Sequence, residues 1–244
     1  MKKKIILGIG IGLIVVIVAA VIIVGFFLGT IVKVGMETVG PKVTQTSLTV
    51  SSVQVGILSG SARINDLVLG NPEAYLAKAP DAISVGKTAV SVAPFSVLSD
   101  KIVIKSVEVI SPEITFEGNP FGANNLKAIM NNVNAFSGGA GPDTNAPTQT
   151  GANKPAKKLE VDDFLISGAK VHFNGATLPL PDIHFSDLGT GPEGITAADL
   201  TKKVLGEISA STIKEVASSV GNAGKAVGSE AGKLGKSLGG LFGK

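Results

Sequence analysis

The sequence contains no cysteine and no tryptophan, and it has only two histidines and few aromatic residues. Without cysteine, a disulfide framework, a thiolate metal site and a cysteine nucleophile are excluded. The net charge of +3 is modest, and basic residues do not cluster with aromatic ones, so we expect no nucleic-acid partner. The sequence has no Gly-x-Ser-x-Gly elbow and no glycine-rich loop ending in Lys-Ser or Lys-Thr. We therefore predict that the protein is not an enzyme and carries no cofactor.

The histidines and neighbouring aspartates also give a weak signal for chemistry. Asp182 and His184 form an Asp-x-His pair that could contribute to a metal site, but the sequence offers no third ligand nearby, and His172 lies on another predicted strand. The adjacent Asp162 and Asp163 would point to opposite faces of a strand. Solvated faces explain these residues better, so we predict no metal site and no catalytic residue.

A long uncharged segment begins the chain. It runs from Ile5 to Val32, and 20 of its 28 residues are Ile, Leu, Val or Phe. As a helix it would be about 42 Å long, which exceeds the roughly 30 Å of bilayer hydrocarbon. We therefore predict a transmembrane anchor within residues 1–33, marked by Ile5, Ile14, Ile23 and Val32. Three lysines precede the segment and a single one follows it, which favours a cytoplasmic N-terminus with the bulk of the chain on the far side.

Two alternatives concern this same segment. Val18-Ala19-Ala20 also fits a signal-peptide cleavage site after a basic start, so cleavage stays open, although the apolar run continues past Ala20 without a polar break. The spacing Gly8-x-Gly10-x-Gly12 would allow two such helices to pack closely, which leaves self-association open as well.

Beyond the anchor, residues 34–136 are expected to form a β-rich region, because β-branched and polar side chains alternate in short runs over residues 43–117, which predicts strands. The phase of the alternation slips between runs, which indicates bulges or turns. A short amphipathic helix is expected over residues 123–136. Residues 137–158 contain no large apolar side chain and are predicted to be a flexible linker. Strand character then resumes over residues 159–194.

The last segment, residues 195–244, changes to a helical period. Thr196 and Asp199 resemble a capping box with Asp in place of Glu or Gln. Eight glycines from Gly221 onward each weaken a helix by about 1 kcal/mol relative to Ala, so this tail needs a surface to lie on. It could lie on a membrane, pack along the sheet, or pair with another helix. The candidate membrane-surface residues are Lys225, Lys233, Leu234, Lys236, Leu238, Leu241 and Phe242.

Several short motifs carry a resemblance. The turn Leu69-Gly70-Asn71-Pro72, the strand end Ser111-Pro112-Glu113-Ile114, the pair Asn125-Leu126 and the later strands over 159–173 follow the apolar segment in this order. Over about residues 5–190 the chain thus resembles the N-terminal region of the AsmA-like family of bacterial envelope proteins. The resemblance implies an inner-membrane anchor, a periplasmic sheet curled into a gutter with an apolar inner face, and a role in moving or sorting lipids.

The chain is much shorter than the long members of that family. Roughly ten strands at about 4.8 Å spacing would build a gutter about 50 Å long. We therefore do not expect one copy to bridge two membranes, and an adaptor or a short stacked unit becomes plausible.

Together these observations predict a mainly β fold with helical ends: an N-terminal transmembrane helix, an antiparallel sheet and a C-terminal amphipathic helix. The resemblance implies that the sheet is curved and gutter-like. The apolar sheet face is predicted to bind lipid acyl chains, which gain about 0.8 kcal/mol per buried CH₂. The candidate groove residues are Leu48, Val50, Val90, Val92, Ile102, Ile104, Val107, Val109, Phe164 and Ile166. The alternative function is a non-catalytic, membrane-tethered scaffold that recruits an envelope protein. The expected partners are membrane lipids, with an envelope protein or a second copy of the chain as further options.

Overall fold

Nine strands form one sheet in the structure, a computed structural model that describes residues 27–137 and 157–241, with side chains of the last helix described up to residue 222. The strands are β1 (Leu48–Gly56), β2 (Ser61–Gly70), β3 (Asp81–Val92), β4 (Lys101–Ile110), β5 (Glu113–Thr115), β6 (Lys158–Ser167), β7 (Lys170–Phe173), β8 (Ala176–Pro179) and β9 (Ile183–Leu188). An α-helix of residues 27–44, which we call the entry helix, precedes the sheet. The other α-helices are α2 (Asn125–Ser137) and α3 (Ala197–Leu241), and two short 3₁₀ helices are η1 (Glu73–Tyr75) and η2 (Pro94–Leu98).

Several short strands continue one another. β6 pairs with β9, and β7 pairs with β8, both antiparallel. The two pairs share one register, which runs from Val161 opposite Leu188 to Phe173 opposite Ala176. The turn between β7 and β8 is Asn174-Gly175, where φ is 48° and 78°, as a two-residue type I′ hairpin turn requires. β4 and β5 likewise share one register against β3. The sheet is therefore built largely from long, bent strands.

Two strand pairs in this sheet are parallel, β4 with β6 and β5 with β7. Their common register runs from Lys101 opposite Lys158 to Thr115 opposite His172. Parallel neighbours require the chain to return to the starting end of the first strand. Here the connections from β4 to β6 and from β5 to β7 include α2.

Local irregularities interrupt the two-residue period of the strands. In β6 the core residues Val161 and Phe164 lie three positions apart. In the paired strand β9, Asp187 has a positive φ of 56°, and in β2 Asp66 has a φ of 49°. Irregularities of this kind bend a strand and increase its twist. They correspond to the phase slips that the sequence predicts.

The entry helix covers the outer edge of β1. The Oε1 atom of Glu37 accepts a 2.9 Å hydrogen bond from the Val50 backbone N–H, and Lys33 Nζ donates to the Ser51 carbonyl at 3.2 Å. A Cβ on Gly29 would lie only 2.1 Å from the Val53 carbonyl oxygen, so only glycine permits this approach. An open edge strand is prone to pair with other chains, and the entry helix occupies this one.

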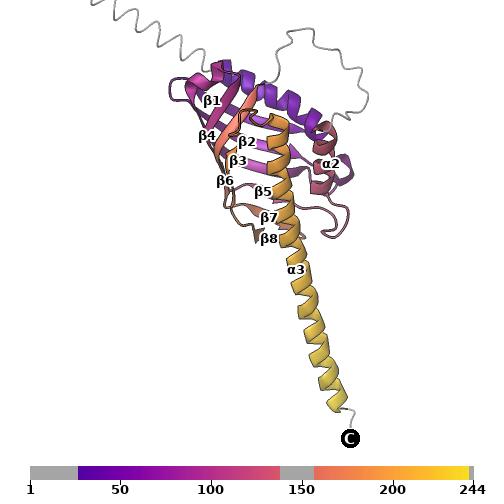
Figure 1. The fold of residues 1–244 in the computed structure, drawn as a ribbon. Coiled ribbons are helices and arrows are strands. Elements are labelled where there is room, and N and C mark those ends of the chain that lie inside the picture. Colours follow the sequence, from indigo (N-terminus) through magenta and orange to yellow (C-terminus); the bar gives the residue numbers. More distant parts are fainter. Residues whose placement is uncertain (1–26, 138–156, 242–244) are drawn as a thin grey trace, which may run out of the picture.

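The long helix α3 lies across one face of the sheet, and its second half extends beyond the sheet (Figure 1). Thr196 Oγ1 accepts a 3.0 Å hydrogen bond from the Asp199 N–H and donates to Asp199 Oδ2 at 2.6 Å. The predicted cap therefore forms, although the carboxylate bonds to the hydroxyl instead of to a backbone N–H. Val216 is fully buried, and Gly206 of α3 faces Met130 of α2.

The predicted mainly β fold with a curved, gutter-like antiparallel sheet is wrong. The protein is mixed α/β: its sheet is largely open and includes parallel pairs, and three α-helices are present in the described residues. Alternation reveals which face of a strand is buried but not which strand lies beside it, so the parallel pairing could not be read from the sequence. The apolar stripe of the tail allowed three interpretations, and its first half packs along the sheet.

The predicted transmembrane helix of residues 5–32 is also corrected where the structure describes it. Residues 27–32 belong to the entry helix, which packs on the sheet, and Val32 faces the space between the two. Within residues 27–137 and 157–241, no helix is both long enough and apolar enough to cross a membrane. Outside the described residues lie Ile5, Ile14, Ile23, the motifs of residues 8–12 and 18–20, most of the predicted linker, and Phe242.

Candidate functional site

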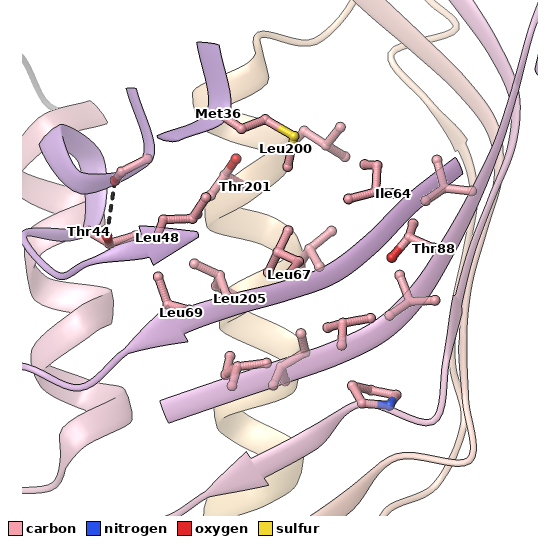
Figure 2. Close-up of a pocket in the computed structure, with 18 of the residues that line it drawn as sticks. Met36, Thr44, Leu48, Ile64, Leu67, Leu69, Thr88, Leu200, Thr201 and Leu205 are labelled. Atoms are coloured by element: carbon pink, nitrogen blue, oxygen red, sulfur yellow. Dashed lines mark hydrogen bonds between the residues drawn. The ribbon is translucent and has the colours of Figure 1, made fainter. Parts of the chain in front are cut away.

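An apolar groove of about 680 Å³ lies between the sheet, the entry helix and α3. Figure 2 shows Ile64 and Leu67 from the sheet, Met36 from the entry helix and Leu200 and Leu205 from α3 around it. This volume falls within the roughly 300–1,000 Å³ that is typical of small-ligand pockets. The groove is therefore large enough for part of a small molecule or an acyl chain.

The lining of this groove is almost free of polar groups. Among the residues that the structure describes, no charged side chain lines it, and its polar side chains are three threonines. Two of their hydroxyls are already used, because Thr44 donates to the Gly40 carbonyl at 3.0 Å and Thr201 donates to the Ala197 carbonyl at 2.8 Å. Such a lining favours an apolar ligand and offers little to recognise a polar one.

The groove is open to solvent along the entry helix. Val32 and Val39 line it, yet their exposed fractions are 41% and 51%. On the opposite side, Leu200, Val204 and Ile208 of α3 form a wall over the sheet. An elongated apolar ligand could therefore enter beside the entry helix and lie under α3.

The structure distributes the predicted groove residues over four environments. Lining the groove are Leu48, Val107, Val109, Phe164 and Ile166. Val90 and Ile104 pack against the core next to it, and Val50 is buried at the entry helix. Val92 and Ile102 are half-buried near η2 and do not line the groove.

Sequence reasoning missed the helical walls of the groove. Met36 and Val39 belong to the entry helix, and Leu205 comes from α3. The helical stripe that starts at Leu200 was visible in the sequence, but nothing in that pattern showed that it would cover the sheet. The other candidate tail residues, Lys225, Lys233, Leu234, Lys236, Leu238 and Leu241, belong to α3, at positions whose side chains lie outside the described part.

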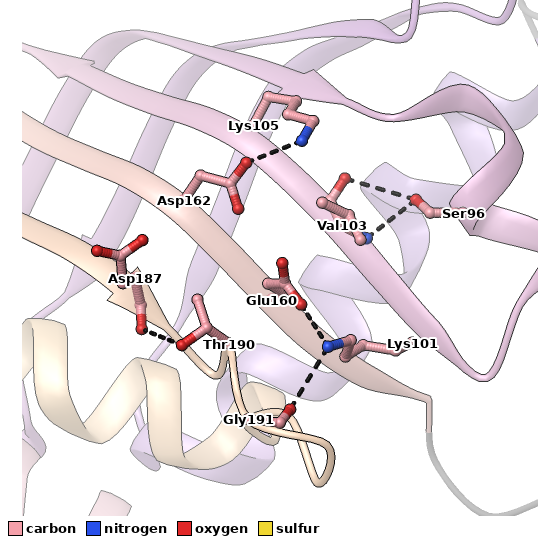
Figure 3. A network of polar contacts seen from close by, with 9 residues as sticks. All are labelled: Ser96, Lys101, Val103, Lys105, Glu160, Asp162, Asp187, Thr190 and Gly191. Atoms are coloured by element: carbon pink, nitrogen blue, oxygen red, sulfur yellow. Dashed lines mark hydrogen bonds and ion pairs between the residues drawn. The ribbon is translucent and has the colours of Figure 1, made fainter.

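The opposite face of the sheet is polar. Lys105 Nζ lies 3.0 Å from Asp162 Oδ2, and Lys101 pairs with Glu160 and donates to the Gly191 carbonyl (Figure 3). Exposed ion pairs of this kind contribute little to stability. Their effect is to keep this face solvated, so that the apolar face with its groove is the distinctive surface.

The histidines do not come together. His184 Nε2 lies 2.6 Å from Asp163 Oδ1, whereas His172 Nδ1 contacts the Thr177 hydroxyl. Asp182 instead accepts a hydrogen bond from the Gly168 N–H. In the part of the chain that the structure describes, no group of three or more His, Asp or Glu side chains is placed to hold a metal ion.

Two of the motifs that carry the family resemblance meet in the core. Asn71, from the Leu-Gly-Asn-Pro turn, and Asn125, at the start of α2, are both buried and hydrogen bonded to each other. Asn71 also donates to the Ala79 and Asp81 carbonyls. Asn71 and Asn125 therefore have a structural role and do not line the groove, whereas Leu69 of the same turn does. Comparison of the sequence with known protein families and with curated proteins finds no match, and the AsmA-like assignment stays a prediction.

Proposed function

We propose that the protein binds an acyl chain of a membrane lipid in its apolar groove and helps to transfer lipid within a bacterial envelope, without catalysis. In this proposal its apolar N-terminal segment attaches it to the inner membrane, its N-terminus is cytoplasmic and its sheet lies in the periplasm. The observation that carries the proposal is a groove of about 680 Å³ in which no side chain of the described lining residues is charged. The resemblance to the AsmA-like family supports it.

The energetics suit an acyl ligand. Each buried methylene contributes about 0.8 kcal/mol, so about ten of them would contribute roughly 8 kcal/mol. Part of this gain offsets the loss of translational and conformational freedom on binding. The remainder gives moderate affinity, which suits a protein that must also release its lipid.

The position of the groove supports the same proposal. Val32 is both the last residue of the uncharged apolar run and a lining residue of the groove. Residues 27–32 already pack on the sheet, so the chain would leave a bilayer before residue 27, and the groove opens within about two helical turns of that point. A lipid tail would have a short path from the membrane into the protein.

Site-specific crosslinking tests this function. Val109 points into the groove, and its neighbour Glu108 is exposed. Successive side chains of a strand point to opposite faces. A photo-crosslinking amino acid at position 109 of the full chain, expressed in bacteria and irradiated in the cells, should form lipid adducts visible by mass spectrometry. The same amino acid at position 108 is the matched control. Equal labelling at both positions, or none at 109, would overturn the proposal.

A second candidate function is a membrane-tethered scaffold that recruits an envelope protein. It is favoured by the half of α3 that extends beyond the sheet (Figure 1). In this case a partner should co-purify with the full chain and be lost when residues 223–244 are removed, while Val216 and the rest of the core stay in place. Lipid adducts at position 109 that survive the same truncation would favour the groove function.

A further inference from the structure

Three large apolar side chains project from two adjacent loops at one end of the sheet. Leu58 lies in the turn between β1 and β2, and Phe95 and Leu98 belong to η2; their exposed fractions are 81%, 86% and 85%. We call these three residues the apolar tip. Loops are normally polar, and large apolar groups gathered on a surface mark a site of interaction.

The two loops of the apolar tip are held side by side. The Val92 N–H donates a 2.6 Å hydrogen bond to the Gly60 carbonyl. A Cβ on Gly60, where φ is 63°, would lie 2.9 Å from Pro94 Cγ, so the close contact depends on glycine. The apolar tip is therefore a formed surface rather than two independent loops.

The apolar tip lies at the end of the molecule where the described chain begins. Gly29 of the entry helix packs on Val53, close to the end of β1 that leads to Leu58. The segment before residue 27 is an apolar run without a charged residue from Ile5 onward. The chain that precedes the described residues therefore joins the protein beside the apolar tip.

Charge does not select the partner at this surface. Lys157 Nζ donates to the Val97 carbonyl of η2, and the exposed Asp100 lies two residues after the end of η2. The two opposite charges lie beside the same apolar side chains. An apolar partner with mixed polar groups at its border fits this arrangement, which is the character of a bilayer interface.

We infer that the apolar tip inserts into the surface of the bilayer to which the N-terminal segment attaches the protein. This inference rests on the membrane attachment in the proposed function but not on a lipid in the groove. The tip and the N-terminal segment then form two contacts at one end of the sheet. Two contacts restrict the orientation of the sheet relative to the membrane. They also keep the groove beside Val32 near the membrane surface.

Introduced tryptophans test the inference, because the sequence has no tryptophan of its own. Phe95→Trp and Leu58→Trp place an indole on each loop of the tip. Phe121→Trp is the matched control: Phe121 is also 72% exposed, but it follows β5, which pairs with the start of β3 instead of its end. The full chain of each variant is incorporated into phosphatidylethanolamine–phosphatidylglycerol vesicles, and flotation measures attachment.

Brominated lipid then reports contact with the acyl region. Interfacial side chains lie about 5–10 Å into the headgroup and acyl boundary, so the indoles at positions 95 and 58 should lose about half of their emission when bromine is placed high on the acyl chain. The indole at position 121 should keep its emission. Flotation without quenching at 95 and 58, or equal quenching at 121, would overturn the inference alone. Failure of all variants to float would overturn the membrane attachment as well.

Discussion

Asn125 Nδ2 donates a 2.7 Å hydrogen bond to Oδ1 of Asn71, although the two residues are 54 positions apart in the sequence. Both side chains are at least 97% buried, with exposed fractions of 0% and 3%. Asn125 also donates to the Thr115 carbonyl and accepts from the Glu117 N–H. One buried amide thus connects the start of α2 to the turn after β2 and to the segment after β5.

Replacing Asn125 with Ala should destabilise the protein by roughly 2–3 kcal/mol, because the Asn71 amide, a backbone carbonyl and a backbone N–H lose buried partners. Urea unfolding of the full chain in detergent would measure the loss as a lower midpoint. Asn131→Ala, at an exposed position of the same helix, should change stability by less than about 0.5 kcal/mol. Similar midpoints for the two variants would show that the amide pair contributes nothing specific.

The second prediction concerns the hydrogen bond from the Val50 N–H of β1 to Glu37 of the entry helix. Glu37→Ala removes the acceptor of the Val50 N–H, so hydrogen exchange at Val50 should become faster and stability should fall by about 1–2 kcal/mol. Glu37→Gln keeps a side-chain oxygen at the same place and should restore most of the protection. Unchanged exchange at Val50 in the Ala variant would mean that the entry helix does not protect this edge.

Two glycines of the entry helix should respond to alanine in opposite directions. At Gly29 a Cβ would lie 2.1 Å from the Val53 carbonyl oxygen, whereas at Gly35 nothing lies within 4 Å. Gly29→Ala should therefore cost about 1–3 kcal/mol through overpacking, and Gly35→Ala should stabilise by about 0.5–1 kcal/mol through helix propensity. Chemical unfolding of both variants measures the difference, and a stabilising effect at Gly29 would contradict the close packing on β1.

Thr212 offers a stabilising substitution. Its Oγ1 is buried and has no hydrogen-bond partner in the described part of the chain. Thr212→Val replaces this unpaired hydroxyl with a methyl group of similar size and should raise stability by about 1 kcal/mol. Thr201→Val is the control, because Thr201 donates to the Ala197 carbonyl and should lose stability. A destabilised Thr212→Val variant would show that the hydroxyl has a partner in solution.

The sequence predicted the kinds of local structure better than their assembly. The helix expected over residues 123–136 corresponds to α2 (Asn125–Ser137), and the cap at Thr196 forms. Period and capping are local properties, so they can be read from one segment. Strand pairing, the parallel register and the placement of α3 depend on contacts between distant segments, and alternation carries no information about those partners.

For the groove as well, residues placed by local strand alternation were predicted, whereas residues placed by long-range packing were not. Val109 and Phe164 were predicted from strand alternation, and both line the groove. The walls formed by Met36 and Leu205 were not predicted, because residues 34–136 were expected to be β-rich and the apolar stripe of the tail left three packing surfaces open. Hydrophobicity reports that a surface is buried but not whether lipid or protein buries it.

The parallel pairing of β4 with β6 also fixes an order of events during synthesis. β1 to β5 pair antiparallel through short connections and can associate as soon as Thr115 has been made. The free edge of β4 has to wait for residues 158–167, which arrive after α2 and a long intervening segment. β6 to β9 close locally around Asn174-Gly175, and local hairpins form within about 1–10 μs. Docking of this finished hairpin onto β4 is the long-range step, and contacts between distant segments are the slower kind to form.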